Sequence, residues 1–238
     1  SFQMLAAELF EQALPGAADF TSPRAWAFTL IGLEEYLRRF SGDRRANQIR
    51  DALTAKLMQR QADAATGDWH WFEDVVSYAN ARLPQALILS GRSTNNPEIL
   101  EAGLKALRWL VKLQTSAAGS FRPIGSNGFH PRGGERAIFD QQPVEAMATV
   151  SACIEAYHAT GKPSWVAEAR RAFEWFLGRN DLGLSLYDAS TGGCRDGLHL
   201  DRVSHNEGAE STLAFLIALA EQQALRNTLT SFKEPDSP

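Results

Sequence analysis

The stretch Asp140-Gln-Gln-Pro-Val-Glu-Ala-Met147 decides the fold, because it has the features of a helix start and recurs in related form along the chain. A polar residue that can cap free backbone N–H groups comes first, and proline or a small residue follows before a long apolar run. The same layout occurs in Phe20-Thr-Ser-Pro-Arg-Ala-Trp-Ala27, Asn80-Ala-Arg-Leu-Pro-Gln-Ala-Leu87 and Asn206-Glu-Gly-Ala-Glu-Ser-Thr-Leu213. Their spacing of about 60 residues predicts a repeat of helical hairpins.

A second set of helices is expected between these starts. The ranges 43–60, 97–114 and 163–179 keep apolar residues three and four positions apart, which is typical of one-sided helices, and an earlier helix is expected over 2–14. The runs after Asp140 and Asn206 leave little polar surface on any side, so these helices should be buried on most sides. We therefore predict an all-α (α/α) toroid with buried inner helices and amphipathic outer helices.

The chain holds about four such hairpins, whereas a closed ring of this kind needs about six. Either the ring is incomplete or the first hairpins lie outside this chain, and a simple helical solenoid is the alternative. Because the sequence begins at Ser1, we expect a trimmed chain or the C-terminal part of a longer one. Residues 1–232 should form one helical domain, and the charged, proline-containing end 233–238 should be a disordered tail.

Composition excludes several classes of function. The chain has 24 Lys and Arg against 28 Asp and Glu, a net charge of −4, so we expect no nucleic-acid partner. It lacks a run of 18 apolar residues that could span a membrane. Its two cysteines, Cys153 and Cys194, do not make a disulfide framework, which favours a cytoplasmic location. Because no P-loop, G-x-G-x-x-G or G-x-S-x-G motif occurs, no cofactor is expected.

The long loops are the expected place for function. The connections 61–79, 115–139 and 179–205 all lead into the N-terminal ends of inner helices, whereas the connections at the other end are short. Carboxylates recur there, and Asp140, Glu73 and Glu210 are the predicted catalytic acids because two such groups can act as general acid and general base on a glycoside. Asp140 fits equally as a helix cap, and Glu73 as a solvated loop acid.

Residues suited to binding a sugar lie in the same loops and first turns. Aromatic rings can stack on sugar rings, and amide, carboxylate and guanidinium groups can bind hydroxyls. On this basis we predict a substrate-binding set of Trp69, Trp71, Asn80, Arg82, Gln141, Gln142, Glu145, Asp196, His205 and Asn206. Asn206 also fits as a helix cap, and Arg82 as the partner of Glu73 or Asp74 in a structural ion pair.

A cluster of metal-ligating residue types occurs before the last inner helix: Cys194, Asp196, His199, Asp201 and His205. Their spacing matches no compact zinc-ligand pattern, so we predict no metal site.

Three motifs carry a resemblance to a known family. They are Trp71-Phe-Glu-Asp74 with Tyr78-Ala-Asn-Ala-Arg-Leu-Pro-Gln-Ala-Leu87, Phe139-Asp-Gln-Gln-Pro-Val-Glu-Ala146, and Thr191-Gly-Gly-Cys194 with Asp196-Gly-Leu198 and Asn206-Glu-Gly-Ala-Glu-Ser-Thr-Leu-Ala214. Over about residues 26–219 the chain resembles a bacterial helical region of the six-hairpin glycosidase-like superfamily that accompanies family 4-type glycosyltransferases and mannoside phosphorylases.

The resemblance implies an (α/α) toroid, carbohydrate metabolism and a glycosyltransferase as a partner. Glu73, Asp140 and Glu210 match its pattern, as do Asn80, Arg82, Gln142 and Asp196, whereas Glu207 stands where members often carry Gln. Two hypotheses follow. The chain is either an enzyme that processes an oligosaccharide or sugar substrate, or a non-catalytic module that binds a glycan or docks to a glycosyltransferase.

Overall fold

The computed structural model describes residues 2–231, so the expected tail 233–238 lies outside the described residues. The described chain is helical, with one small sheet, and divides into two compact units. Unit 1 comprises Ser1–Asp74 and Arg82–Ala106, and unit 2 comprises Val75–Ala81 and Leu107–Pro238. None of the helices within residues 2–231 has the length and apolar character needed to cross a membrane.

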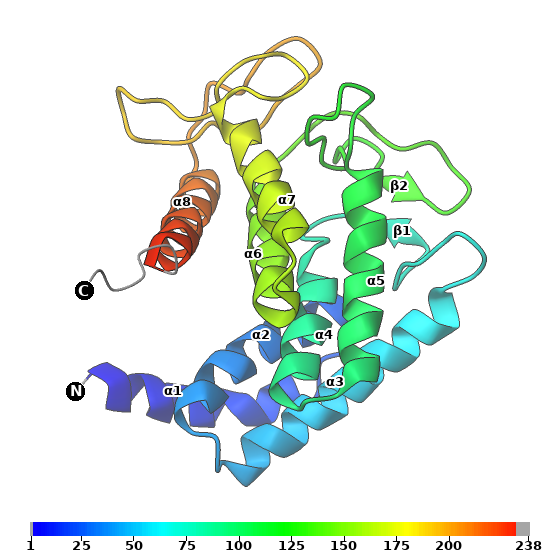
Figure 1. The fold of residues 1–238 in the computed structure, drawn as a ribbon, viewed down its shortest axis with the longest axis vertical. Coiled ribbons are helices and arrows are strands. Elements are labelled where there is room, and N and C mark those ends of the chain that lie inside the picture. Colours follow the sequence, from blue (N-terminus) through cyan, green and yellow to red (C-terminus); the bar gives the residue numbers. More distant parts are fainter. Residues whose placement is uncertain (1, 232–238) are drawn as a thin grey trace, which may run out of the picture. The chain divides into compact units, whose positions relative to one another are not determined.

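Unit 1 contains the first helices, labelled in Figure 1: α1 (Phe2–Ala17), α2 (Pro23–Arg39), α3 (Arg44–Ala64), α4 (Arg82–Ser93) and the first part of α5 (Pro97–Leu113). Pro23 occupies the first turn of α2, as its place in the repeat predicts. Helices α2, α3 and α4 pack on one another. Helices α4 and α5 approach closely because Gly91 has no Cβ, which would overlap the backbone of Leu100.

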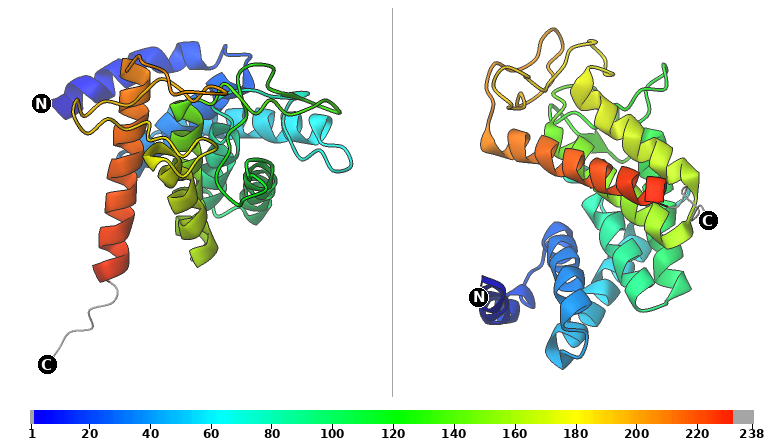
Figure 2. Two further views of the ribbon diagram at one scale, coloured as in Figure 1. Left: turned by 90° about the horizontal axis from the view of Figure 1, so that it is seen from above. Right: turned by 60° about the vertical axis from the view of Figure 1, so that its left-hand side comes forward.

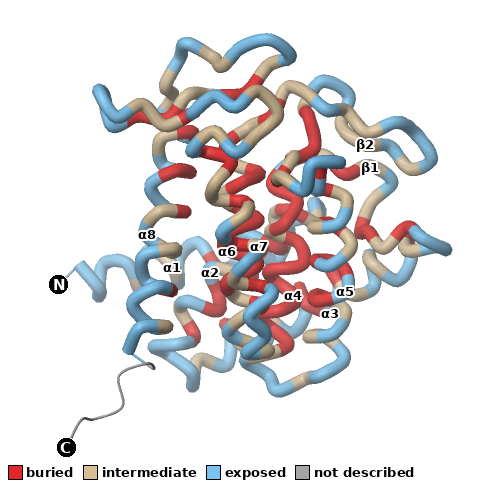
Figure 3. The backbone as a smooth tube through the Cα atoms, turned by 45° about the horizontal axis from the view of Figure 1, so that its top comes forward, coloured by how far each residue is buried: buried red, intermediate tan, exposed pale blue. Residues whose placement is uncertain are grey.

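Unit 2 contains α6 (Pro143–Thr160), α7 (Pro163–Glu174), the short 3₁₀ turn η1 (Trp175–Leu177) and α8 (Ala209–Ser231). Strands β1 (Val75–Val76) and β2 (His130–Pro131) pair antiparallel, with Val75 opposite Pro131. Helix α6 packs against α7 and α8, and Figure 2 shows α8 alongside α7. Helix α6 is buried along most of its length, as predicted for an inner helix (Figure 3).

The expected helices and loops are confirmed in outline. The predicted outer helices correspond to α1, α3, α5 and α7 with η1, and the predicted starts correspond to α2, α4, α6 and α8. The connection between α2 and α3 is short, whereas residues 178–208 form a long loop beyond the C-terminal end of α7 (Figure 1). The long loops thus precede the inner helices, as the sequence predicts.

Helix α8 differs from its prediction. Its apolar run was expected to be buried on most sides, but Leu213, Leu216 and Ile217 are 56%, 46% and 43% exposed. Ala214, Phe215 and Ala218 form its buried side. The physical reason is that α8 packs in unit 2 against α6 and α7, which cover one side of the helix.

Candidate functional site

Asp140 and His199 form the central pair of the candidate site in unit 2. The backbones of Gln141 and Leu198 exchange two hydrogen bonds of 2.9 Å as an antiparallel bridge. Residues that flank such a bridge lie opposite each other, and His199 Nδ1 lies 2.6 Å from Asp140 Oδ1. The two side chains are 32% and 42% exposed, so solvent reaches the pair. Asp140 Oδ2 makes no hydrogen bond to any described residue.

The start of α6 places a free amide beside this pair. Gln142 occupies the N-cap position of α6, but its side chain makes no capping hydrogen bond. It is half-buried, and its carboxamide bonds to none of the residues 2–231. The carboxylate of Asp140 bonds to His199 rather than to the N–H groups of the helix. Two groups able to bind hydroxyls therefore sit at the N-terminal end of a buried helix.

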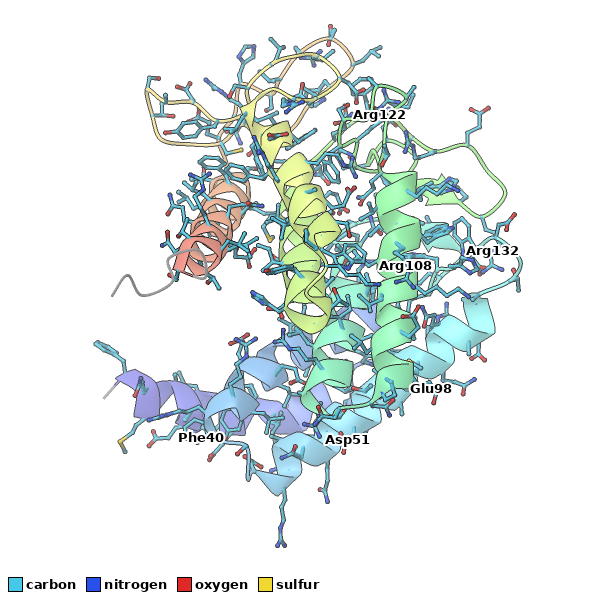
Figure 4. The ribbon with its side chains drawn as sticks, in the orientation of Figure 1. Phe40, Asp51, Glu98, Arg108, Arg122 and Arg132 are labelled. Atoms are coloured by element: carbon cyan, nitrogen blue, oxygen red, sulfur yellow. The ribbon has the colours of Figure 1, made fainter. Side chains whose placement is uncertain are left out.

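A buried network fixes the backbone on which Asp140 lies. Gln141 is fully buried; its Oε1 accepts a hydrogen bond of 2.8 Å from Trp175 Nε1, and its Nε2 donates one of 2.6 Å to Asp181 Oδ2. Arg122 Nε donates to Asp181 Oδ1 over 2.8 Å. Figure 4 labels Arg122 in the loop after α5. The network joins this loop, the start of α6 and the loop after η1, and it occupies both side-chain polar atoms of Gln141, the residue next to Asp140.

We expect Asp181→Asn to lower the free energy of unfolding by about 1–3 kcal/mol, because an amide cannot accept from both Arg122 and Gln141 in this partly buried place. Chemical denaturation of the variant and the parent measures the difference. Asp201→Asn is the matched control, because Asp201 is 72% exposed and pairs with its neighbour Arg202. Equal losses in the two variants would contradict the role given to the network.

Glu145 and Asn80 bind each other inside unit 2. Glu145 is 2% exposed; one carboxylate oxygen accepts from the backbone N–H of Ala79, and the other lies 2.8 Å from Asn80 Nδ2 and 3.3 Å from Asn80 N. Ala79 has a φ of 46°, a left-handed conformation that non-glycine residues rarely adopt. The structure therefore brings these two predicted binding residues together as a buried clamp on the turn before α4.

Asp196 and Asn206 also meet, at the entrance to α8. One oxygen of Asp196 accepts from Gly208 N over 2.6 Å, and the other accepts from Asn206 Nδ2. Burial alone would raise the pKa of Asp196, but hydrogen bonds from Asn206, Gly208 and Ser211 outweigh it and hold the pKa below its ordinary value. Asp196 is therefore a carboxylate at neutral pH that orders the turn into α8. His205 and Glu210, from the same segment, are exposed to solvent.

Four predicted residues belong to unit 1: Glu73, Trp69, Trp71 and Arg82. Glu73 forms an ion pair with Arg24, whose side chain is 8% exposed, so its partner is not Arg82. Trp69 Nε1 donates to the backbone oxygen of Glu73 over 2.8 Å. Trp71 is fully buried and presents no ring face to solvent, and Arg82 donates to Gln85 Oε1 over 2.6 Å.

The residues before α8 whose types can bind a metal are not grouped as metal ligands. Within residues 2–231, no group of three or more His, Cys, Asp or Glu side chains is arranged to hold a metal ion. Burial, with Asp196 and Glu207 nearby, raises the pKa of Cys194 to about 12, so its sulfur stays a protonated thiol at neutral pH.

His199 was considered from the sequence only as a metal ligand, and its pairing with Asp140 was missed. The bridge that brings the two together joins residues far apart in the chain, and no periodicity marks it. Arg122 and Asp181 were missed for the same reason. The only hint in the sequence was that both are charged residues in long loops. A charged side chain needs an oppositely charged or hydrogen-bonding partner when its loop packs against the protein interior.

Comparison with known proteins gives structural likeness without sequence likeness. No protein-family model matches the chain, and no curated protein sequence does. Among solved structures, it is similar to a GH76 alpha-mannanase of Bacteroides thetaiotaomicron, with a TM-score of 0.61 and 10% identity over 85% of this chain and 52% of that one. It is similar to an unsaturated glucuronyl hydrolase specific for heparin, with a TM-score of 0.64 and 16% identity over 92% and 61%.

A third similar structure is a possible GH105 family member from Salmonella enterica serovar Paratyphi A, with a TM-score of 0.56 and 18% identity over 86% of this chain and 53% of that one. The chain spans between half and two thirds of the length of these three proteins. All three have the six-hairpin glycosidase fold. The chain therefore has the all-α hairpin fold of the six-hairpin (α/α) toroid glycosidases, over part of its length.

Proposed function

We propose that this chain cleaves glycosidic bonds and that Asp140 transfers the proton. The observation that carries the proposal is the solvent-reachable pair of Asp140 and His199 at the start of a buried inner helix. The hydrogen bond from the imidazole fixes Oδ1, while Oδ2 stays available to a water molecule or to the glycosidic oxygen. The fold supports the proposal because the similar solved structures carry the names of glycoside hydrolases.

Hydrolysis needs a second acid, because the proton removed from the attacking water must be balanced by one given to the leaving oxygen. We propose Glu210 for this role, since it is an exposed carboxylate at the first turn of α8, in the same unit as Asp140. Glu73, the other acid predicted from the sequence, is occupied by Arg24, so we assign it a structural part.

Sugar binding is proposed for three polar side chains that a ligand can reach: Gln142, His205 and the exposed Asn206. Glu145, Asn80, Gln141 and Asp196 are proposed as positioning residues, because other parts of unit 2 occupy their polar atoms. The motif resemblance supports a further part of the proposal, namely that the oligosaccharide is one that a glycosyltransferase assembles in the cytoplasm.

A panel assay tests the function. The purified chain is incubated with α-linked manno-oligosaccharides, unsaturated disaccharides from heparin and neutral β-linked oligosaccharides, and newly formed sugars are separated by chromatography. The first two substrates follow from the printed names of the similar structures. Cleavage of one class that disappears in Asp140→Asn supports the proposal. Binding without cleavage across the panel contradicts it and favours the non-catalytic glycan-binding module.

A further inference from the structure

A polar cavity of about 730 Å³ lies within unit 1. It is bounded by the C-terminal half of α2, by α3, and by the turn from α4 to α5. None of the residues assigned above to catalysis or sugar binding lines it. Asp51, labelled on α3 in Figure 4, lies on its rim. Its volume is within the range of about 300–1,000 Å³ that is usual for small-molecule sites.

The floor of this cavity contains a buried carboxylate. Glu34 is 4% exposed, and its hydrogen-bond donor is the neutral hydroxyl of Ser93, 2.9 Å from Oε1. The nearby guanidinium of Arg50 is directed at Asp51 Oδ1, with Nε at 3.0 Å and Nη2 at 2.8 Å. Its Nη1 bonds to no described residue. A carboxylate so placed is costly for the free protein, because the hydroxyl of Ser93 and the other groups nearby replace its hydration shell only in part.

A second buried polar group in the same cavity lacks a partner. Thr54 is 4% exposed, and within residues 2–231 its hydroxyl oxygen makes no hydrogen bond. Folded proteins leave few buried polar atoms unsatisfied, and each of them calls for an explanation. Glu34, Thr54 and Arg50 all line this cavity, from two helices, and their side chains comprise one acceptor, one hydroxyl and one donor.

The lining indicates which ligand would satisfy these groups. Its charges balance, with Arg38 and Arg50 against Glu34 and Asp51, so neither a strong anion nor a strong cation gains from the field of the cavity. Hydroxyl groups both donate and accept, and the apolar side chains of Met58 and Ile99 can cover the C–H face of a ring. We propose that this cavity binds an uncharged polyhydroxyl ligand, a monosaccharide unit, through hydrogen bonds to Glu34, Arg50 and Thr54.

This site does not depend on the proposed hydrolysis. The cavity lies at the C-terminal ends of α2 and α4 in unit 1, whereas Asp140 and His199 precede inner helices of unit 2. A chain that fails to cleave any glycoside can still bind a sugar here, and a chain that cleaves one can leave this cavity empty. An experiment can therefore refute sugar binding in this cavity without refuting glycoside cleavage at Asp140, and the reverse.

The stability of the free protein gives a first test. Burial raises the pKa of Glu34 above its ordinary value of 4.5, and the hydroxyls of Ser93 and Ser90 with the charges of Arg50 and Arg92 offset this only in part. The folded state thus holds this proton more tightly than the unfolded state, and the stability that Glu34 contributes falls as the pH rises above 4.5. We expect Glu34→Gln to melt above the parent at pH 8 and level with it near pH 4, in thermal scans.

The matched control for this measurement is Glu35→Gln, the next residue on α2, which is exposed and does not line the cavity. Its melting temperature should follow that of the parent at both pH values. A parent that melts above Glu34→Gln at pH 8 would show that the carboxylate is satisfied within the free protein, which would overturn the need for a ligand.

Binding itself is measured by NMR titration of the whole chain with glucose, mannose and galactose. We expect shifts of the Ser93, Thr94 and Asn96 amides at millimolar sugar, and at least tenfold weaker binding in Glu34→Gln, since a hydrogen bond to a buried charge is lost. Met58→Trp should weaken binding as much, because it fills the cavity and leaves every polar group in place. Glu35→Gln should bind as the parent does.

Glucuronate and glucosamine test whether the cavity prefers an uncharged ligand. Each has nearly the same ring as glucose, but glucuronate carries a negative charge and glucosamine a positive one. We expect both to bind more weakly than glucose, because the cavity carries balanced charge. Tighter binding of glucosamine would make the site one for a cation, and tighter binding of glucuronate would make it one for an anion; either result overturns the proposal. Absence of shifts with all five sugars, or shifts that persist unchanged in both Glu34→Gln and Met58→Trp, also overturns it.

Discussion

Asp140→Asn is expected to lower kcat on the cleaved substrate by about 10²–10⁴-fold, the usual contribution of a general acid or base. An amide in this place cannot take up or release a proton, yet it keeps the size of the carboxylate beside His199. Because the Asp140 side chain is 42% exposed, the substitution should leave the unfolding free energy nearly unchanged. Steady-state rates and circular-dichroism melting curves of the same preparation measure the two effects.

Two further variants test whether the loss of rate is specific to the carboxylate of Asp140 and depends on His199. Asp201→Asn changes an exposed acid in the loop that carries His199, paired with Arg202, and should keep the parental rate. His199→Gln tests a positioning residue: it should lower kcat by about tenfold, because the carboxylate of Asp140 loses the imidazole partner that fixes its position. A parental rate in Asp140→Asn would remove this carboxylate from the reaction.

Glu145→Ala is expected to lower the free energy of unfolding by about 3–5 kcal/mol, the usual loss when one partner of a buried charged contact is removed. The carboxylate accepts from Ala79 N, Asn80 N and Asn80 Nδ2, and alanine leaves all three donors buried without it. The φ of 46° at Ala79 adds to the loss, because the clamp no longer holds this turn in its left-handed conformation. Urea denaturation of variant and parent measures the difference.

Glu210→Ala is the matched control for stability, since Glu210 also lies in the first turn of an inner helix but is exposed. It should change the unfolding free energy by less than about 0.5 kcal/mol. Glu145→Gln keeps one carbonyl acceptor and should lie between the two variants. If Glu145→Ala were as stable as Glu210→Ala, the carboxylate would not be the group that holds the turn before α4.

The fold could be predicted from the sequence because it rests on local signals. Pro23 and Pro143 begin inner helices, and the three-and-four spacing over 97–114 gives an outer helix, α5, that ends at Leu113. These features act within one or two helical turns, so no tertiary contact is needed to recognise them. The exposure of Leu213 and Leu216 on α8 could not be predicted in this way, because it depends on which helices lie beside α8.

The candidate site could be predicted only in part. Asp140 was singled out because it is a carboxylate that follows a long loop and precedes an inner helix, where it also fits as a helix cap. Its partner His199 could not be predicted, because it depends on a backbone bridge between distant loops. Gln141 and Glu145 were marked as binding residues by type and place, but the sequence did not show that both are buried with partners inside unit 2. Glu34 went unnoticed because nothing in an amphipathic helix shows which polar residue faces a cavity.

The bridge between Gln141 and Leu198 limits how these loops can change in evolution. Side chains alternate in direction along paired backbone, so a one-residue insertion or deletion next to the bridge would turn Asp140 or His199 toward the opposite side. Segments outside the pairing, such as the exposed stretch 133–135, carry no such restriction. Homologous chains can therefore diversify their loop tips while the spacing beside the bridge stays constant.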